Sequence, residues 1–298
     1  MRNLFIILLL NLFLVLPVSA EVVTLSHDGS TLNANLKQAS SDWQAGPVVL
    51  MTHGTLAHRG MEIIAGLQGM FADRGISSLA INLSLGLDNR AAAMYDCATP
   101  HTHQHTDAVG EIGAWVAWMK AQGVERITLL GHSRGGNQVA RFAADQDDPV
   151  LDRIILLAPM TWDAAYAAQD YKKRYGEELA PLLARAQKMV AEGKGGEMMT
   201  GVDFIYCEDA SATAAAFLSY HGADDRLDTP ALLKSIRAPV TVFAGTEDTT
   251  VKGLIEKVEP LADGKSISLV KVDGADHFFR DLYSEDIADM IAELLDAG

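Results

Sequence analysis

The chain has 298 residues, of which 49% are hydrophobic and 21% are charged, and this is the composition of an ordinary globular protein. Its length suffices for one large α/β domain or for two small ones. The formal net charge of -15 argues against a nucleic-acid partner, because phosphate binding needs a basic face, and it also disfavours polyanionic substrates.

Residues 1–20, MRNLFIILLLNLFLVLPVSA, have the pattern of a targeting segment. Arg2 precedes an apolar run from Leu4 to Leu16, which is shorter than the roughly 20 residues that span a bilayer. The small residues that follow predict a secretory signal cleaved after Ala20. We therefore expect an exported protein, periplasmic or secreted, with no stable membrane anchor after cleavage. An uncleaved N-terminal anchor is the alternative.

After a predicted hairpin over Val22–Leu36, short apolar runs alternate with amphipathic segments. The runs are rich in Val, Ile and Leu, which is typical of buried parallel strands. They are PVVLMTHG, ISSLAINLS, RITLLGH, DRIILLAP, APVTVFAGTED and SISLVKVDGADH. The predicted helices span residues 61–74, 107–122, 137–145, 254–261 and 282–295. This alternation predicts an α/β fold with a doubly wound, mostly parallel sheet and helices on both faces.

Residues 160–228 interrupt the alternation, because they contain helical patterns and no convincing strand. An insertion that follows a strand ending in LAP is expected to cover the carboxyl edge of the sheet, where open α/β sheets bind ligands. The sequence thus predicts a core of residues 21–159 and 229–298 with a helical cap of residues 160–228.

Gly131-His132-Ser133-Arg134-Gly135 is a G-x-S-x-G pentapeptide between a predicted strand and a predicted helix. A sharp turn at this place would lift the serine hydroxyl above the sheet, and the glycines would avoid clashes there. The pattern alone is weak, and its strand-turn-helix context makes it specific. Ser133 is the predicted nucleophile.

A serine nucleophile needs a base, usually histidine, oriented by a carboxylate. Of the nine histidines, two follow Ser133, namely His221 in the cap and His277 after the last predicted strand. His277 is the predicted base, because it leaves the same sheet edge as Ser133. The carboxylate is predicted to be Asp248, with Glu247 as the alternative.

Two backbone donors are expected to stabilise an oxyanion. One is the N–H of Arg134, next to the nucleophile, and the other is the N–H of Thr55, in the loop after the VVLMTHG strand. His53 in that loop is interpreted as a structural side chain that braces it, in preference to a role in proton transfer.

The motifs THGT, GHSRGG, GTED and GADH, in this order, resemble those of the α/β-hydrolase superfamily over nearly all of the mature chain. The resemblance implies a Ser-His-Asp hydrolase with Ser133 as nucleophile, His277 as base and Asp248 as the orienting carboxylate. It identifies no subfamily. Arg134 departs from the pattern, because it places a charge beside the nucleophile.

Cys97 follows the ISSLAINLS strand and Cys207 lies in the cap, so both are expected near the carboxyl edge of the sheet. Because export supplies an oxidising compartment, a disulfide between them is predicted, with two separate thiols as the alternative. The segment HTHQH, which holds His101, His103 and His105, is interpreted as a solvated loop in preference to a metal site.

These features predict an exported serine hydrolase that cleaves a small-molecule carboxylic ester through an acyl-enzyme, with no cofactor and no metal. Other reactions on the same triad remain open: amide or peptide cleavage, thioester hydrolysis and acyl transfer. A non-catalytic binding protein of this fold is the third possibility, although such a protein is expected to lose a member of the triad. The oligomeric state is not predicted.

Overall fold

The computed structural model describes residues 20–296. The predicted signal segment therefore lies outside the described residues, except for Ala20. None of the helices within residues 20–296 is long and apolar enough to cross a membrane.

An eight-stranded sheet forms the centre of the molecule, with the strand order β1-β2-β4-β3-β5-β6-β9-β10. Within it β2 runs antiparallel to β1 and β4, and the other neighbouring pairs are parallel. The strands are β1 (Glu21–His27), β2 (Ser30–Lys37), β3 (Val48–Thr52), β4 (Ser77–Asn82), β5 (Ile127–His132), β6 (Leu151–Leu157), β9 (Val240–Gly245) and β10 (Ile267–Val272). The predicted mostly parallel sheet is confirmed.

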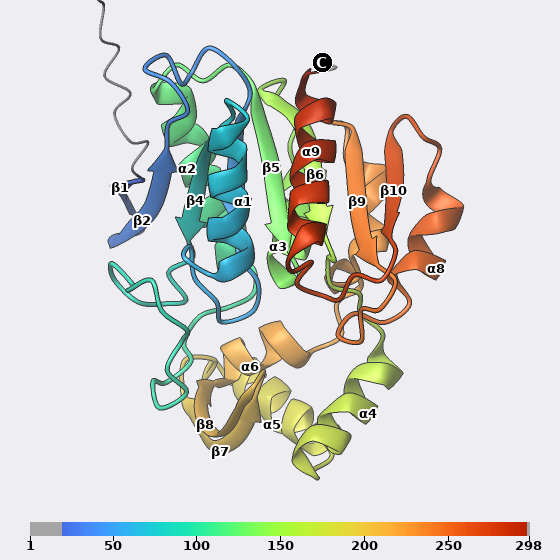
Figure 1. Cartoon of the computed structure of the whole chain (residues 1–298). Helices are drawn as coiled ribbons and strands as arrows, with labels where there is room; N and C mark the ends of the chain where they lie inside the picture. The colour runs from blue at the N-terminus through green and yellow to red at the C-terminus, as the bar shows by residue number, and fades with distance from the viewer. Residues whose placement is uncertain (1–19, 297–298) are drawn as a thin grey trace, which may run out of the picture.

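Helices cover both faces of the sheet, which is why β3, β4, β5 and β9 are buried along their whole length and read as continuous apolar runs. In Figure 1, α1 (Glu62–Asp73) and α9 (Leu282–Asp296) lie side by side on the near face. The opposite face packs against α2 (Asp107–Ala121), α3 (Arg134–Ala144) and α8 (Leu254–Val258), which continues into η3 (Glu259–Leu261).

Each face has its own apolar core. Phe71 and Ile291 are fully buried between the sheet and the pair α1 and α9, and Trp115 of α2 is fully buried on the other face. Truncation of such a buried aromatic side chain to Ala typically costs about 3–5 kcal/mol of unfolding free energy. These two packed cores hold the sheet in place, and with it the edge from which the loops after the parallel strands extend.

The insertion between β6 and β9 contains more than helices. Its elements are α4 (Ala164–Tyr175), α5 (Leu179–Ala191), β7 (Met198–Phe204), β8 (Cys207–Thr213), α6 (Ala214–His221), η1 (Asp225–Leu227), α7 (Thr229–Leu232) and η2 (Leu233–Ser235). The expectation of no strand within residues 160–228 is wrong, because β7 and β8 form an antiparallel hairpin. Register shifts around Val202 break the strict alternation by which a strand is detected in a sequence.

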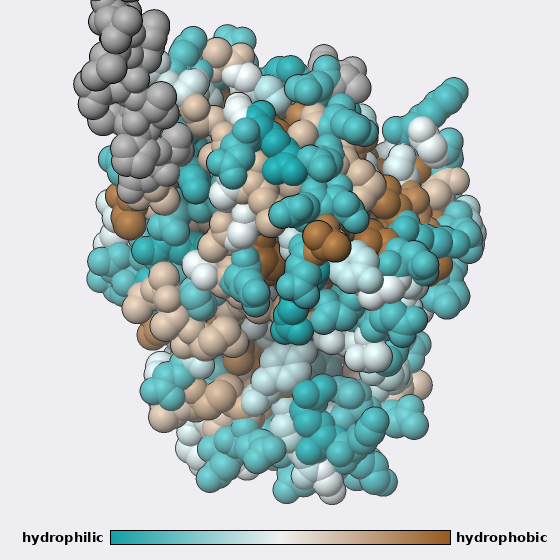
Figure 2. Space-filling view, viewed as in Figure 1, coloured by the Kyte–Doolittle hydropathy of each residue, from teal (hydrophilic) through white to brown (hydrophobic). Residues whose placement is uncertain are grey.

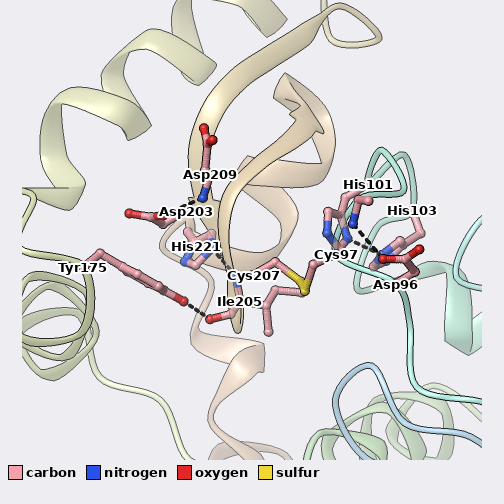
Figure 3. The surroundings of a disulfide bond; sticks show 11 residues. Asp96, Cys97, His101, His103, Tyr175, Asp203, Ile205, Cys207, Asp209 and His221 are labelled. Carbon is pink, nitrogen blue, oxygen red and sulfur yellow. Dashed lines mark hydrogen bonds between the residues drawn. A yellow bond between two sulfur atoms is a disulfide. The ribbon is translucent and has the colours of Figure 1, made fainter.

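The cap lies below the carboxyl ends of the strands in Figure 1 and is joined to the core on its hairpin side. A disulfide connects Cys97 of the core to Cys207 of β8 (Figure 3). Nearby, the His101 N–H donates to the Ser211 carbonyl (2.7 Å), and the Thr213 N–H donates to the His101 carbonyl (2.9 Å). A core segment and a cap strand are therefore fastened both covalently and through their backbones.

The surface visible in Figure 2 is mainly hydrophilic, with hydrophobic residues in small groups. This agrees with the acidic composition, which favours solubility.

Candidate active site

Ser133 occupies a strained turn between β5 and α3. Its backbone has φ 57° and ψ -121°, a region that costs a non-glycine residue about 1–3 kcal/mol. The Ser133 N–H donates to the Leu157 carbonyl (2.9 Å), and the Ser133 carbonyl accepts the N–H groups of Gly136 (3.0 Å) and Met160 (3.0 Å). These bonds to β6 and to the start of the cap hold the serine in this conformation.

The glycines of the pentapeptide are required by close backbone contacts. A Cβ on Gly131 would lie 2.5 Å from the Gly135 carbonyl oxygen, and a Cβ on Gly135 would lie 2.2 Å from the His53 carbonyl oxygen. Both distances are far inside van der Waals contact, so a side chain at either position would displace the turn that carries Ser133.

His277 and Asp248 form a buried pair after β10 and β9. Nδ1 of His277 lies 2.8 Å from Oδ2 of Asp248, and each side chain is 6% exposed. Oδ1 of Asp248 accepts the N–H groups of Thr250 (2.7 Å) and Val251 (3.0 Å). Burial raises the pKa of Asp248, but the His277 hydrogen bond and these N–H groups outweigh it, so the pKa lies below its usual value.

The two alternatives, Glu247 and His221, are not part of this pair. Glu247 is exposed, and its backbone N–H donates to the Ala275 carbonyl. His221 is in the cap, where its ring lies 4.8 Å from that of Phe217 and its Nε2 accepts the Ile205 N–H (3.4 Å). Burial lowers the pKa of His221 to about 3.

Ser133 and His277 line one cavity of about 570 Å³ between the core and the cap. Thr55 and Arg134 line it as well, so all four side chains meet the same space. Much of the remaining wall is aromatic, and these residues are Trp162, Tyr166, Tyr171, Tyr175, Tyr206, Tyr220 and Phe278. The cavity has the size and the mostly apolar wall of a small-molecule site.

The loop with the predicted second oxyanion donor passes directly against Ser133. A Cβ on Gly54 would lie 3.3 Å from the Cβ of Ser133. Within residues 20–296, the N–H groups of Thr55 and Arg134 have no hydrogen-bond acceptor. Both are thus available to a ligand oxygen.

His53 is buried under this loop and holds it. Its Nδ1 donates to the Gly54 carbonyl (2.9 Å), while its Nε2 accepts the Leu83 N–H (3.1 Å) and lies 3.2 Å from the Arg90 guanidinium. Burial and the charge of Arg90 lower the pKa of His53 to about 3. A neutral ring with both nitrogens engaged agrees with the structural interpretation of His53.

The Arg134 side chain turns into the cavity. Its Nε donates to the Thr55 hydroxyl (3.1 Å), its Nη1 lies 3.4 Å from Nδ1 of His105, and its guanidinium lies 5.1 Å from the centre of the Tyr220 ring. Burial lowers the pKa of Arg134, and Tyr220 acts in the opposite direction. The sequence analysis did not place Asn137, His105 or Tyr220 beside Arg134. The signal available was the position of Asn137, which lies four residues after Ser133 and faces the core.

The interpretation of HTHQH as a solvated loop is wrong. His101, His103 and His105 are 0%, 1% and 0% exposed, because β8 and α6 of the cap cover the segment. A hydrogen bond joins His101 Nδ1 to His103 Nε2 (3.2 Å), as Figure 3 shows, and another joins His103 Nδ1 to the Tyr220 hydroxyl (2.8 Å). Burial lowers the pKa of His101 to about 4 and that of His103 and His105 to about 3.

Within the described part of the chain, no group of three or more His, Cys, Asp or Glu side chains is arranged to hold a metal ion. Apart from Nε2 of His101, the ring nitrogens of the three histidines take part in hydrogen bonds with one another, Tyr220, Asn137 and Arg134. The segment is therefore a packed polar layer between core and cap.

The model of the alpha/beta hydrolase family matches residues 48–290. Est1E from Butyrivibrio proteoclasticus is similar in structure, with a TM-score of 0.64, 19% identity, and coverage of 92% of this chain and 96% of that chain.

Two further solved structures have the same fold. The α/β hydrolase GrgF from Penicillium sp. sh18 has a TM-score of 0.66, 17% identity, and coverage of 93% of this chain and 97% of that chain. An esterase of Pyrococcus furiosus has a TM-score of 0.61, 16% identity, and coverage of 94% and 91%. No curated protein matches the sequence. At these identities the likeness establishes the fold alone.

Proposed function

Because the chain belongs to the α/β-hydrolase family, we propose that it is an exported serine hydrolase that cleaves carboxylic esters through an acyl-enzyme. The observation that carries the proposal is that the Ser133 turn and His277, which is hydrogen-bonded to Asp248, line one cavity. Nucleophile, base and orienting carboxylate are the three parts that such chemistry needs.

In the proposed reaction, His277 takes the hydroxyl proton of Ser133 as Oγ attacks the ester carbonyl carbon. Asp248 accepts a hydrogen bond from Nδ1, so it favours the tautomer with Nε2 free and stabilises the imidazolium that forms. The N–H groups of Thr55 and Arg134 would bind the oxyanion of the tetrahedral intermediate.

Collapse of the intermediate breaks the ester C–O bond, and the imidazolium gives its proton to the leaving alcohol. Water then attacks the acyl-enzyme carbonyl, with His277 taking its proton. Release of the acid returns the proton to Ser133 and restores the starting state.

Export is supported by the N-terminal pattern and by a disulfide, which persists in oxidising compartments. The choice of ester is supported by the esterases among the similar structures, from Pyrococcus furiosus and from a Rhodothermus marinus protein. The aromatic walls of the cavity suit a small apolar acyl or aryl group.

The test compares 4-nitrophenyl esters of increasing chain length with a matched 4-nitroanilide, using exported protein. We expect ester hydrolysis, covalent labelling of Ser133 by a fluorophosphonate, and a fall in kcat of about 10⁴-fold or more in Ser133→Ala. Faster cleavage of the anilide would assign the triad to amides. Retained hydrolysis and labelling in a clean Ser133→Ala preparation would overturn the proposal.

A further inference from the structure

We propose that the natural substrate is an ester that also carries a carboxylate, and that the Arg134 guanidinium binds this carboxylate inside the cavity. The inference deepens the proposed function and rests on it. It starts from a cation beside the nucleophile that lacks a carboxylate partner in the described residues.

A guanidinium has five N–H donors, and the described residues engage two of those of Arg134. Nε donates to the Thr55 hydroxyl and Nη1 points to His105, both of which are neutral groups. Within residues 20–296, no Asp or Glu oxygen lies within 4.0 Å of Arg134. A half-buried cation without a counter-ion is costly, and a ligand carboxylate would supply the missing charge through paired, charge-assisted hydrogen bonds.

The other charged side chains of the cavity wall differ from Arg134. Arg174 pairs with Asp170 (3.0 Å), and the Asp163 carboxylate caps α4 by accepting the Tyr166 N–H (2.9 Å). Lys252 is exposed. Arg134 is thus the cavity cation that combines burial, closeness to Ser133 and missing charge compensation.

Hydrogen bonds fix the side chains that hold Arg134. His105 Nε2 donates to Oδ1 of Asn137 (2.8 Å), while Nδ2 of Asn137 lies 2.9 Å from the Arg226 carbonyl and 3.2 Å from the Thr229 hydroxyl, which fixes the amide. His105 Nδ1 is then left as an acceptor for Arg134. Because the guanidinium is held in place before a ligand arrives, little side-chain entropy is lost on binding.

Because Arg134 and Ser133 line the same cavity, the proposed chemical class is a small ester that carries a carboxylate in addition to the reacting carbonyl. The carboxylate can belong to the acyl part or to the alcohol part, so two pairs of probes are needed. Mono-(4-nitrophenyl) glutarate is compared with 4-nitrophenyl pentanoate, and 3-acetoxybenzoate is compared with phenyl acetate.

The first readout is the ratio of kcat/KM between the anionic and the neutral ester of each pair. In Arg134→Met we expect this ratio to fall at least about tenfold in one pair, mainly through KM, because the variant loses the charge and keeps the backbone N–H. Arg134→Lys keeps the positive charge but loses the paired N–H groups of the guanidinium. Its ratio should lie between those of wild type and Arg134→Met. Lys252→Met removes a positive charge from the same wall and should change the ratio less than about threefold.

Fluorophosphonate titration counts the competent sites in each preparation, so loss of folded protein does not enter the ratio. If Arg134→Met lowers both members of each pair equally, the side chain assists the oxyanion or the fold, and the inference is overturned. A wild-type preference for the neutral ester in both pairs overturns it as well.

The second readout does not depend on turnover. Ser133→Ala protein is titrated by calorimetry with the anionic and the neutral ester of each pair, and Ser133→Ala/Arg134→Met is titrated in the same way. We expect tighter binding of the anion, lost in the double variant. Equal binding of the anionic and the neutral ester in both pairs refutes the carboxylate site, whereas the proposed hydrolase function fails only if wild-type protein cleaves none of the four esters.

Discussion

Two groups of histidines are buried in this hydrolase, one consisting of His277 at the cavity and the other of His101, His103 and His105 between core and cap, and their partners differ. His277 lies against the carboxylate of Asp248, which can stabilise a positive imidazolium. His101, His103 and His105 have neutral partners or a cationic one, and burial lowers their pKa values to about 3 or 4.

Burial alone therefore does not make a histidine a base. A buried ring can serve as a base when a carboxylate compensates the charge of its protonated form, and it otherwise serves as a fixed polar packing element. The first group is therefore expected to control turnover and the second group to control stability.

The largest effect is expected from exchanging one histidine of each group for glutamine. In His277→Gln, kcat should fall about 10⁴-fold, because the proposed base is gone. In His103→Gln, kcat per competent site should fall less than about tenfold, whereas the Tm should drop, because ring contacts with Tyr95 and Phe204 are lost.

Steady-state kinetics and thermal unfolding on the same samples check this prediction. The His277 backbone carbonyl, which accepts a hydrogen bond from His132 (3.0 Å), is kept in His277→Gln, so its Tm should stay near wild type. If His103→Gln lost most of its kcat although all of its sites were competent, the distinction between the two histidine groups would be wrong.

The carboxylate partner offers the next largest effect. Asp248→Asn should lower kcat about 10³-fold or more, because it removes the charge that compensates the imidazolium. Glu247→Gln is the matched control, since its side chain is exposed and one residue away, and it should change kcat less than about twofold. Kinetics with a 4-nitrophenyl ester decide, and the reverse order would transfer the role to Glu247.

Removal of the disulfide tests how the segment with His101, His103 and His105 is held in place. Cys97→Ser/Cys207→Ser opens a link across a sequence separation of 110 residues, which should cost about 2–4 kcal/mol of unfolding free energy. Urea unfolding measures it, with reduced wild-type protein as the control. If reduction leaves the stability unchanged, the backbone bonds at His101 hold the segment without the link.

The smallest effect concerns pH. The pKa of His103 is about 3 in the folded chain and about 6.5 when unfolded, so the unfolded state binds more protons between these values. Its contribution to stability is full above pH 6.5 and is lost as the pH falls toward 3. His103→Gln should therefore reduce the pH slope of the unfolding free energy by about 1.4 kcal/mol per pH unit.

Urea unfolding of both proteins at several pH values between 4 and 6 provides the slopes. Identical slopes would mean that His103 already titrates alike in both states, and the comparison between the two histidine groups would lose its electrostatic basis.

Strands and motif order were readable from the sequence because their signals are local. Val48–Thr52 and Val240–Gly245 are almost entirely apolar, and the serine turn, Asp248 and His277 each follow a strand within a few residues. Since parallel strands place their carboxyl ends on one edge, the topology alone brings these residues together.

The missed features depend on contacts between distant segments. His101 is buried by backbone pairing with Ser211 and Thr213, more than a hundred residues away. The β7–β8 hairpin was missed because its register shifts hide the alternation. The charge at Arg134 was visible in the sequence, but its lack of a carboxylate neighbour depends on what the fold places around it.

The fastening of the cap on one side has a consequence for the route of the substrate. The hairpin is linked to the core by the disulfide at Cys207 and by backbone hydrogen bonds at His101. In contrast, α4 contacts the hairpin through hydrogen bonds that the hydroxyls of Tyr171 and Tyr175 donate to backbone carbonyls. The covalent link therefore holds the hairpin side of the cap more firmly than the α4 side, which is attached through hydrogen bonds. We expect substrates to enter and products to leave past α4. Bulkier side chains along that helix should therefore slow substrate entry and product release more than they slow the bond-breaking step.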